Sequence, residues 1–260
     1  MRIASTRLTA AAALGAGSLA LVACGSSDKV ATACKSQIAV NQGFRQLFTQ
    51  TPALQGNGPP PKSAIPQISA NFDRYVAAPL DKFEKDAPAA VASDVKAAVA
   101  AGRGVREGDV AGLMSPQIQA KANRFDAYFY DKCSGEKGDV KGVDYAFRDL
   151  KSSYPAGTVR FKLDNAGKED HEMVFLRRKP GVTESFAQIV KLPQSQAQPK
   201  VDFIGSVDNV APGKSGFESL QLTPGQYVAV CFIPKGSTPG KQGKGPPDAA
   251  LGMVKQFSVK

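Results

Sequence analysis

The residues of this chain that could carry out chemistry are few and widely separated. His171 is the only histidine among 260 residues, Cys231 lies in a run of alternating apolar residues, and Met253 comes close to the C-terminus. Imidazole, thiol and thioether groups are the ligands that soft transition-metal ions prefer. Each residue also has an ordinary interpretation, because Cys231 and Met253 fit a protein core and a backbone carbonyl can satisfy His171. The choice between these interpretations depends on the elements that position the side chains.

The same scarcity argues against hydrolytic catalysis. No G-x-S-x-G nucleophile motif accompanies His171, and no second imidazole exists to act as a base. Glu169 and Asp170 form a pair of carboxylates, but they lie in a turn, where we expect them to be solvated. We therefore expect a protein that is not an enzyme and has no catalytic residues.

The N-terminus indicates export and lipid attachment. Arg2 and Arg7 precede an uncharged stretch, residues 8–23, that is too short to cross a bilayer comfortably. The stretch ends in Leu21-Val22-Ala23-Cys24, which resembles the lipobox of bacterial lipoproteins. Ordinary cleavage after Ala23 is the alternative, but it would place bulky Leu21 where a small residue is wanted. The resemblance implies that residues 1–23 are a signal peptide and that Cys24 carries a diacylglyceryl group and a further acyl chain such as palmitate, which anchors the protein on the extracytoplasmic face of the cell membrane.

The segment after the anchor and the net charge indicate which partners are plausible. Residues 24–33 begin with small polar residues and predict a short flexible tether.

Removing residues 1–23 lowers the net charge from +10 to +8, because that segment holds two arginines and no acidic residue. Such a charge favours weak, screened contact with lipid headgroups or anionic envelope components, although it can equally serve solubility alone. No basic stripe with interleaved aromatic residues is present, so we expect no nucleic-acid partner.

Residues 34–134 predict a bundle of about four helices. Apolar residues recur at helical spacing in four segments, and breakers rich in Gly or Pro separate the segments. Pro66 and Pro79 blur the ends of the second segment. The four apolar stripes are Ile38, Phe44, Leu47 and Phe48; Ile65, Ile68, Phe72, Tyr75 and Val76; Val91, Val95 and Val99; and Ile118, Phe125, Tyr128 and Phe129. These aromatic residues are expected to be core residues.

Three cysteines remain once Cys24 is assigned to lipid, and the sequence allows three pairings among Cys34, Cys133 and Cys231. An antiparallel bundle with an even number of helices brings its first and last residues to the same end. Cys34 and Cys133 occupy those two places, so we predict a disulfide between them that closes a loop of about 100 residues. Cys231 is then left as a free thiol.

Residues 143–260 predict a β-sandwich of about seven strands, joined to the bundle by a linker over residues 135–142. The period changes abruptly from helical spacing to alternation, which indicates an α+β chain of two domains. One helix is expected between Gly181 and Lys191. The alternating sets are Val143, Tyr145 and Phe147; Val159, Phe161 and Leu163; His171, Met173 and Phe175; Tyr227, Ala229, Cys231 and Ile233; and a last strand from Met253 to Val259.

The placement of the three soft donors in this half resembles the cupredoxin-like fold. His171 follows the turn Asn165-Ala166-Gly167, Cys231 follows Gln226-Tyr227-Val228-Ala229-Val230, and Met253 follows Leu251-Gly252. The resemblance implies a Greek-key β-sandwich in which His171, Cys231 and Met253 match the first imidazole, the thiolate and the axial thioether of a type 1 copper site.

One ligand position departs from that pattern. Asp248 stands five residues before Met253, where the family places a second histidine, and no other histidine can replace it. A carboxylate is a hard donor that suits Cu(I) poorly. The segment between Cys231 and Asp248 is rich in Gly and Pro, so we expect a long, loose loop. The prediction is therefore that His171, Cys231 and Met253 cluster, while Asp248 lies outside the cluster or on a mobile loop.

Two functions are compatible with this reading. In the first, which the missing histidine favours, the protein is a non-enzymatic membrane lipoprotein whose cupredoxin-like domain holds no cofactor and acts as a binding or scaffold module. In the second, it binds copper or transfers electrons through His171, Cys231 and Met253, with Asp248 or water completing the ligand set. Fold resemblance alone does not decide between them.

Overall fold

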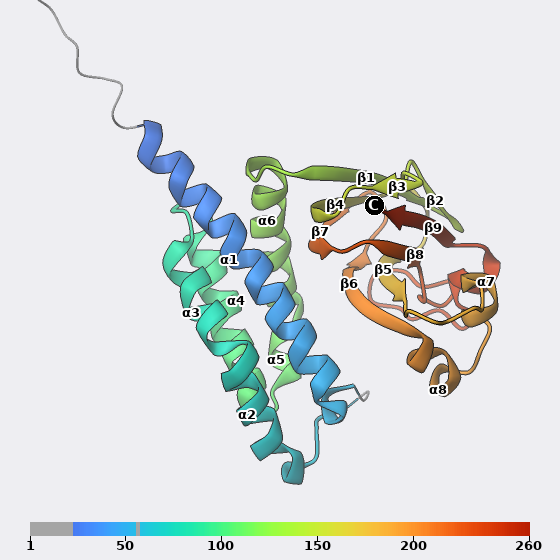
Figure 1. The fold of residues 1–260 in the computed structure, drawn as a ribbon, viewed down its shortest axis with the longest axis horizontal. Coiled ribbons are helices and arrows are strands. Elements are labelled where there is room, and N and C mark those ends of the chain that lie inside the picture. Colours follow the sequence, from blue (N-terminus) through green and yellow to red (C-terminus); the bar gives the residue numbers. More distant parts are fainter. Residues whose placement is uncertain (1–22, 56–57) are drawn as a thin grey trace, which may run out of the picture.

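The computed structural model describes residues 23–55 and 58–260. It consists of a helical region beside a β-sandwich, with the long helix α1 on the side of the helical region that faces the sandwich (Figure 1). Apart from Ala23, the predicted signal peptide lies outside the described residues, and so does the side chain of Cys24. Within the described part of the chain, no helix combines the length and the apolar character needed to span a membrane.

The helical region begins earlier than the sequence indicated. Helix α1 starts at Ala23, so residues 24–33, which we expected to be a flexible tether, are helical. Ala33 and Cys34 are already buried in the helical core, which gives this first part of α1 a packed face. The helices are α1 (Ala23–Gln50), α2 (Ile65–Tyr75), α3 (Ala77–Asp86), α4 (Ala92–Gly104), α5 (Val110–Leu113) and α6 (Pro116–Lys132), with 3-10 turns at Pro52–Leu54, Lys62–Ala64 and Val105–Glu107.

The four predicted apolar stripes lie on α1, α2, α4 and α6. The structure adds α3, which continues from α2 after a break at Val76. Proline explains the break, because Pro79 has no N–H to bond the carbonyl of Tyr75, four residues earlier. Leu80 and Phe83 of α3 join the same core as Ile68 and Phe72 of α2.

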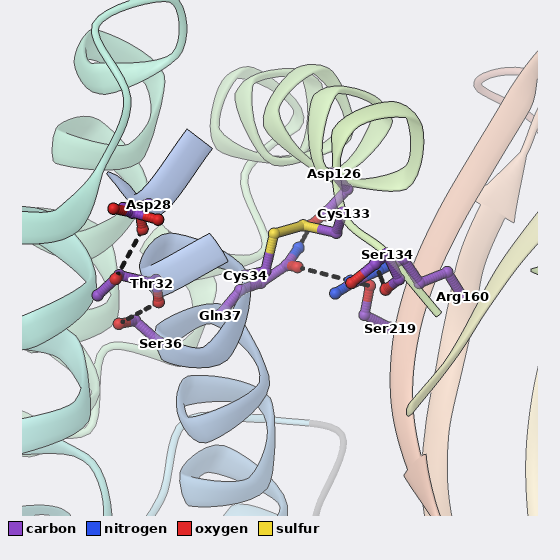
Figure 2. The surroundings of a disulfide bond; sticks show 10 residues. All are labelled: Asp28, Thr32, Cys34, Ser36, Gln37, Asp126, Cys133, Ser134, Arg160 and Ser219. Atoms are coloured by element: carbon purple, nitrogen blue, oxygen red, sulfur yellow. Dashed lines mark hydrogen bonds between the residues drawn. A yellow bond between two sulfur atoms is a disulfide. The ribbon is translucent and has the colours of Figure 1, made fainter. Parts of the chain in front are cut away.

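The predicted disulfide between Cys34 and Cys133 is present, with the two Cα atoms 5.9 Å apart. It ties α1 to the residue that ends α6, close to the point where the chain enters the sandwich (Figure 2). The two cysteines are 99 residues apart in sequence. Closing a loop of this length in the unfolded chain stabilises the folded state by about 4 to 5 kcal/mol at most.

The C-terminal half is a sandwich of two sheets. One sheet has the strand order β2-β1-β4-β7 and the other has the order β3-β9-β8-β5-β6. The chain crosses between the sheets several times, so most neighbouring strands are not consecutive in sequence. The strands are β1 (Glu136–Val143), β2 (Ala146–Arg148), β3 (Ser153–Tyr154), β4 (Gly157–Asn165), β5 (His171–Arg178), β6 (Val201–Val210), β7 (Ser215–Leu222), β8 (Gly225–Val230) and β9 (Val254–Val259).

Strand β1 occupies the segment that was predicted to be a linker. Residues 136–143 pair with β4 in parallel, and their buried positions alternate with exposed ones. The sequence hides this pattern because glycine fills two inward positions. A Cβ atom on Gly138 would lie 2.6 Å from the ring of Phe161, so the aromatic side chain occupies the space that an apolar side chain on β1 would otherwise fill.

Other elements of this half also differ from the prediction. The expected strand over residues 143–147 is the end of β1, a turn and the short strand β2. Strands β6 and β7 were not predicted, because irregular register between β5 and β6 breaks the alternation in β6, and β7 buries Gly216 and Ser219. The helix expected between residues 181 and 191 is the single turn α7 (Phe186–Ile189), followed by α8 (Gln194–Ala197) and a 3-10 turn at Gln198–Lys200.

The two halves meet through polar as well as apolar contacts. The Nδ2 atom of Asn41 on α1 donates to Glu218 of β7 at 2.8 Å, and Gln37 Nε2 donates to Asp126 of α6 at 2.6 Å. Burial raises the pKa of Asp126 to about 7; the Gln37 hydrogen bond and Arg160 oppose this rise, and the charge of Asp208 adds to it. Burial, together with the charges of Asp126 and Asp208, also raises the pKa of Glu218 well above its usual range. Carboxylates from α6, β6 and β7 therefore face one another where the helices meet the sandwich.

The raised pKa of Asp126 predicts that stability falls as pH rises. The carboxyl group has a pKa near 3.9 in the unfolded chain and about 7 in the folded one, so its favourable contribution is complete below about pH 4 and is lost as pH passes through 7. We expect a loss of about 2 kcal/mol, less than the full pKa difference implies, because the side chain keeps some contact with solvent. Urea unfolding from pH 4 to 8 should show this loss in the wild type and much less of it in Asp126→Asn. Asp131→Asn, an exposed change on the same helix, should follow the wild type, and parallel profiles for wild type and Asp126→Asn would contradict the prediction.

Candidate metal centre

Three neighbouring strands bring the predicted ligand residues to one end of the sandwich. Strand β8 lies between β5 and β9, with Val230 opposite both Val174 and Val254. His171 is the first residue of β5, and Cys231 directly follows β8. Met253 directly precedes β9, and its carbonyl accepts a hydrogen bond from the Cys231 N–H at 3.1 Å. Antiparallel pairing therefore places these three residues at the same end of the sheet.

His171, Cys231 and Asp248 form a compact group of possible metal ligands. One ligand atom from each residue lies within 4.8 Å of the other two. The Oδ2 atom of Asp248 is 3.0 Å from His171 Nδ1 and accepts a hydrogen bond from Cys231 Sγ at 3.5 Å. All three residues are 0 % exposed. The group offers one nitrogen, one sulfur and one oxygen donor in a site closed to solvent.

The predicted position of Asp248 was wrong. We expected it outside the cluster or on a mobile loop, and it lies inside the cluster at the start of a 3-10 turn, Asp248–Leu251. Its N–H donates to the Ile233 carbonyl at 3.0 Å, and its own carbonyl accepts from the N–H of Met253 at 3.0 Å. The backbone on both sides of Asp248 is thus tied to the strands that carry Cys231 and Met253.

The segment between Cys231 and Asp248, expected to be loose, is hydrogen-bonded along its length. Lys235 N–H donates to the Pro246 carbonyl at 2.9 Å, and Gly236 N–H donates to Glu169 Oε2 at 2.6 Å. Asp170 N–H donates to the carbonyl of Ser237, which is itself buried. The expectation that Glu169 and Asp170 are solvated is also wrong for Asp170, whose side chain is buried. The turn before β5 therefore holds this loop in place.

Met253 lies beside the imidazole of His171. A Cβ atom on Gly142 would be 3.5 Å from Met253 Cε and 3.6 Å from His171 Cδ2, so these two side chains pack against the same point of β1. Met253 and Cys231 also share the main core of the sandwich. The structure thus brings the end of the Met253 side chain and the His171 ring to the same point of β1.

Asp144 is a part of the site that the sequence did not reveal. Its Oδ1 atom lies 3.0 Å from His171 Nε2, the ring nitrogen that faces away from Asp248. The N–H of Lys168 donates to both oxygens of Asp144, at 3.0 and 3.2 Å. Gly167 leaves the room for this contact, because a Cβ there would lie 2.2 Å from Asp144 Oδ1 and 2.7 Å from His171 Nε2. The only available signal was the Asn165-Ala166-Gly167 turn, and it gives no indication that Asp144 is its partner.

Burial raises the pKa of the acidic groups at this site, whereas hydrogen bonds to them lower it. Burial raises the pKa of Cys231 to about 12, and the charges of Asp248 and Glu172 add to this effect. Burial also raises the pKa of Asp248, although hydrogen bonds from Cys231 and His171 oppose the rise. For Asp144 burial is outweighed by hydrogen bonds from Lys168 and His171, and the pKa is lowered. The thiol is therefore protonated at neutral pH, while Asp144 is an anion beside the ring.

The donor set fits a metal ion. Among the described residues, Asp248 Oδ1 is a buried oxygen with no hydrogen-bond partner, although Oδ2 of the same carboxylate has two. A buried polar atom without a partner costs about 1 to 3 kcal/mol, and a bound cation would remove that cost. Imidazole, thiolate and carboxylate are all established ligands of copper and zinc. Asp144 would then hold the outer nitrogen of the liganding imidazole, as carboxylates commonly do at metal sites.

Comparison with solved structures finds auracyanins and rusticyanin similar to about half of this chain. Reduced auracyanin from Roseiflexus castenholzii is 17% identical and aligns with 49% of this chain and 98% of its own, at a TM-score of 0.33. Auracyanin A, a blue copper protein from Chloroflexus aurantiacus, is 15% identical and aligns with 48% of this chain and 98% of its own, at a TM-score of 0.33. Rusticyanin from Thiobacillus ferrooxidans is 20% identical and aligns with 49% of this chain and 79% of its own, at a TM-score of 0.31. No family model matches the sequence, and no curated protein matches it. At these TM-scores the function must be argued from the site itself.

The contact between Asp144 and His171 predicts a measurable loss of stability when its charge is removed. Asp144→Asn keeps the shape of the side chain but replaces a charged acceptor, so we expect the free energy of unfolding to fall by about 1 to 3 kcal/mol. Asp149→Asn is the matched control, since Asp149 is exposed, makes only a surface ion pair with Lys141 and has a positive φ of 66° that asparagine tolerates. Urea unfolding of metal-free protein checks both variants. Equal stability of Asp144→Asn and Asp149→Asn would show that the contact does not stabilise the fold.

Proposed function

We propose that this protein binds a single copper ion through His171, Cys231 and Asp248 and is held by lipid on the extracytoplasmic face of the membrane. The observation that supports the copper site is the position of Asp248, whose buried carboxylate meets the imidazole and the thiol and keeps one oxygen unpaired. The Asp248 carboxylate would thus occupy the ligand position that a second histidine fills in the family pattern. The side chain of Met253 packs against the same glycine as the ring and could supply a further soft group.

The carboxylate determines which copper chemistry is favoured. Histidine and cysteine suit both oxidation states of copper, whereas a hard oxygen donor favours Cu(II) over Cu(I). A site that holds one oxidation state much better than the other exchanges electrons poorly at ordinary potentials. We therefore favour binding of copper over rapid electron transfer, and we expect Zn(II) to compete because the same donors suit it.

The rest of the chain fits a binding protein of the cell envelope. Cys24 would carry the lipid, and the helical region, interpreted as a four-helix bundle, would space the Greek-key sandwich from the membrane. The protein would act without catalysis, since the sequence offers a single histidine and no G-x-S-x-G motif beside it. The cationic surface would bind anionic envelope components by weak, screened attraction.

A metal-free binding or scaffold module is the second candidate. Its support is that the three donors already satisfy one another, because Asp248 Oδ2 is hydrogen-bonded to the ring and accepts from the thiol. A site that is stable without metal does not need one to fold. Direct titration separates this candidate from copper binding.

Copper titration of the full chain carrying Cys24→Ser, which cannot be acylated, tests the metal site. We expect one equivalent of Cu(II) to bind with a thiolate charge-transfer band, and both binding and band to disappear in Cys231→Ser. Asp248→His supplies the missing second imidazole, so it should strengthen the band and retain Cu(I) more tightly. Asp149→Asn, which changes charge far from the ligands in sequence and on the surface, should behave as the parent. Absence of stoichiometric uptake, or uptake that survives in Cys231→Ser, would leave the scaffold function as the better conclusion.

Cell fractionation tests the anchor separately. A protein with two or more acyl chains stays with the membrane, and removing the acylated residue releases it. We expect the wild type to sediment with membranes and to incorporate labelled palmitate, while Cys24→Ser incorporates none. Cys231→Ser should still incorporate the label, because Cys231 is buried. Labelling of Cys24→Ser at the wild-type level would disprove lipid attachment at this residue.

A further inference from the structure

A cavity of about 740 Å³ lies between the helical region and the sandwich, beside the disulfide. Its walls come from the first part of α1, the end of α6, and strands β4 and β7. The disulfide itself forms part of the wall, together with apolar side chains that include Val30, Ile38 and Tyr128. The volume is within the range of sites that enclose small organic ligands, which are often found between domains.

Arg160 places a buried positive charge in the wall of this cavity. It lies on β4, is 2 % exposed, and reaches from the sandwich toward α1 and the disulfide (Figure 2). Its Nη1 atom donates to Ser219 Oγ at 2.6 Å and to Gln37 Oε1 at 3.4 Å, and Nε donates to the Ser134 carbonyl at 3.4 Å. All of these acceptors are neutral.

No acidic side chain among the described residues forms an ion pair with Arg160. The nearest negative partner along the hydrogen bonds is Asp126, which is reached only through Gln37. Burial lowers the pKa of Arg160, and the charge of Asp126 offsets this only in part. A buried cation without an anionic partner is costly. An anion in the cavity would supply the missing countercharge.

The mouth of the cavity adds further positive charge. Lys35 on α1 and Lys132 at the end of α6 are exposed and line the cavity from its helical side. Lys132 also pairs with Asp131 at 2.8 Å, whereas no carboxylate is among the described residues that line the cavity. Three cations and an apolar wall therefore face the same space.

We propose that this cavity binds an amphipathic anion, with its phosphate or carboxylate group at Arg160, Lys35 and Lys132 and its apolar part against Val30, Ile38 and Tyr128. Guanidinium and ammonium groups bind such anions through short, charge-assisted hydrogen bonds. The ligand source is either the headgroup of an anionic membrane lipid or a free organic phosphate or carboxylate, since the recognising chemistry is the same. Because the walls come from both halves of the chain, a bound ligand would also hold the two halves together. The proposal is independent of the copper site and of Cys24.

Calorimetric titration of the full chain carrying Cys24→Ser with dodecyl phosphate, below its micelle concentration, tests the site. We expect one molecule to bind, and dodecyltrimethylammonium, with the same tail and the opposite charge, not to bind. The variant Lys35→Gln/Lys132→Gln should weaken binding by about tenfold or more, as expected for lost hydrogen bonds between charged groups. Lys62→Gln/Lys96→Gln, an equal charge change outside the cavity, should bind like the parent. Arg160→Met should abolish binding, and the lysine variants keep the test valid if that variant does not fold.

Vesicles and inorganic phosphate distinguish the ligand sources. Binding to phosphatidylglycerol vesicles but not phosphatidylcholine vesicles, with loss in Lys35→Gln/Lys132→Gln, would identify a membrane lipid. Binding of dodecyl phosphate without vesicle binding would identify a free ligand, and either result supports the anion site. The proposal is overturned if dodecyl phosphate does not bind, if the cavity and control lysine variants bind alike, or if inorganic phosphate binds as tightly as dodecyl phosphate.

Discussion

The imidazole of His171 is held by a carboxylate on each ring nitrogen, and the geometry of the proposed copper site depends on this double contact. Asp248 lies 3.0 Å from Nδ1, and Asp144 lies 3.0 Å from Nε2. Asp144 follows β1 of the four-stranded sheet, whereas Asp248 precedes β9 of the five-stranded sheet. The ring therefore joins the two sheets at one end of the sandwich. Ionisable groups can be buried only when hydrogen bonds satisfy them, so the loops that carry both acids must be fixed in place.

The replacement of a second histidine by Asp248 changes what the site does without metal. A neutral imidazole has one acceptor nitrogen, whereas Asp248 Oδ2 is hydrogen-bonded to the His171 ring and also accepts from the Cys231 thiol. The donors consequently attract one another in the metal-free state. A metal ion that binds here would have to displace these hydrogen bonds and the thiol proton, which would lower its apparent affinity.

The sequence predicted the parts of this protein that depend on local pattern. The four apolar stripes and the pairing of Cys34 with Cys133 follow from periodicity and from the ends to which helices bring their residues, whereas the meeting of His171 with Cys231 was implied by the resemblance to the cupredoxin-like fold. The position of Asp248 was missed because Gly and Pro predict a loose loop, whereas backbone hydrogen bonds to distant residues hold it. Strand β1 was missed because Gly138 is an inward position filled by the ring of Phe161, which no local pattern reveals.

The contact between the two halves requires both of them to be present. Gln37 of α1 lies between Arg160 of β4 and Asp126 of α6, donating to Asp126 and accepting from Arg160. Without the helices, Arg160 would lose its acceptor Gln37 and gain solvent, and Glu218 would lose its hydrogen bond from Asn41. Polar groups that are buried only by docking make the interface specific, because a shifted arrangement would leave them unpaired. The helical region therefore sets the electrostatic environment of this face of the sandwich, and the unpaired charge left on Arg160 gives the cavity its preference for anions.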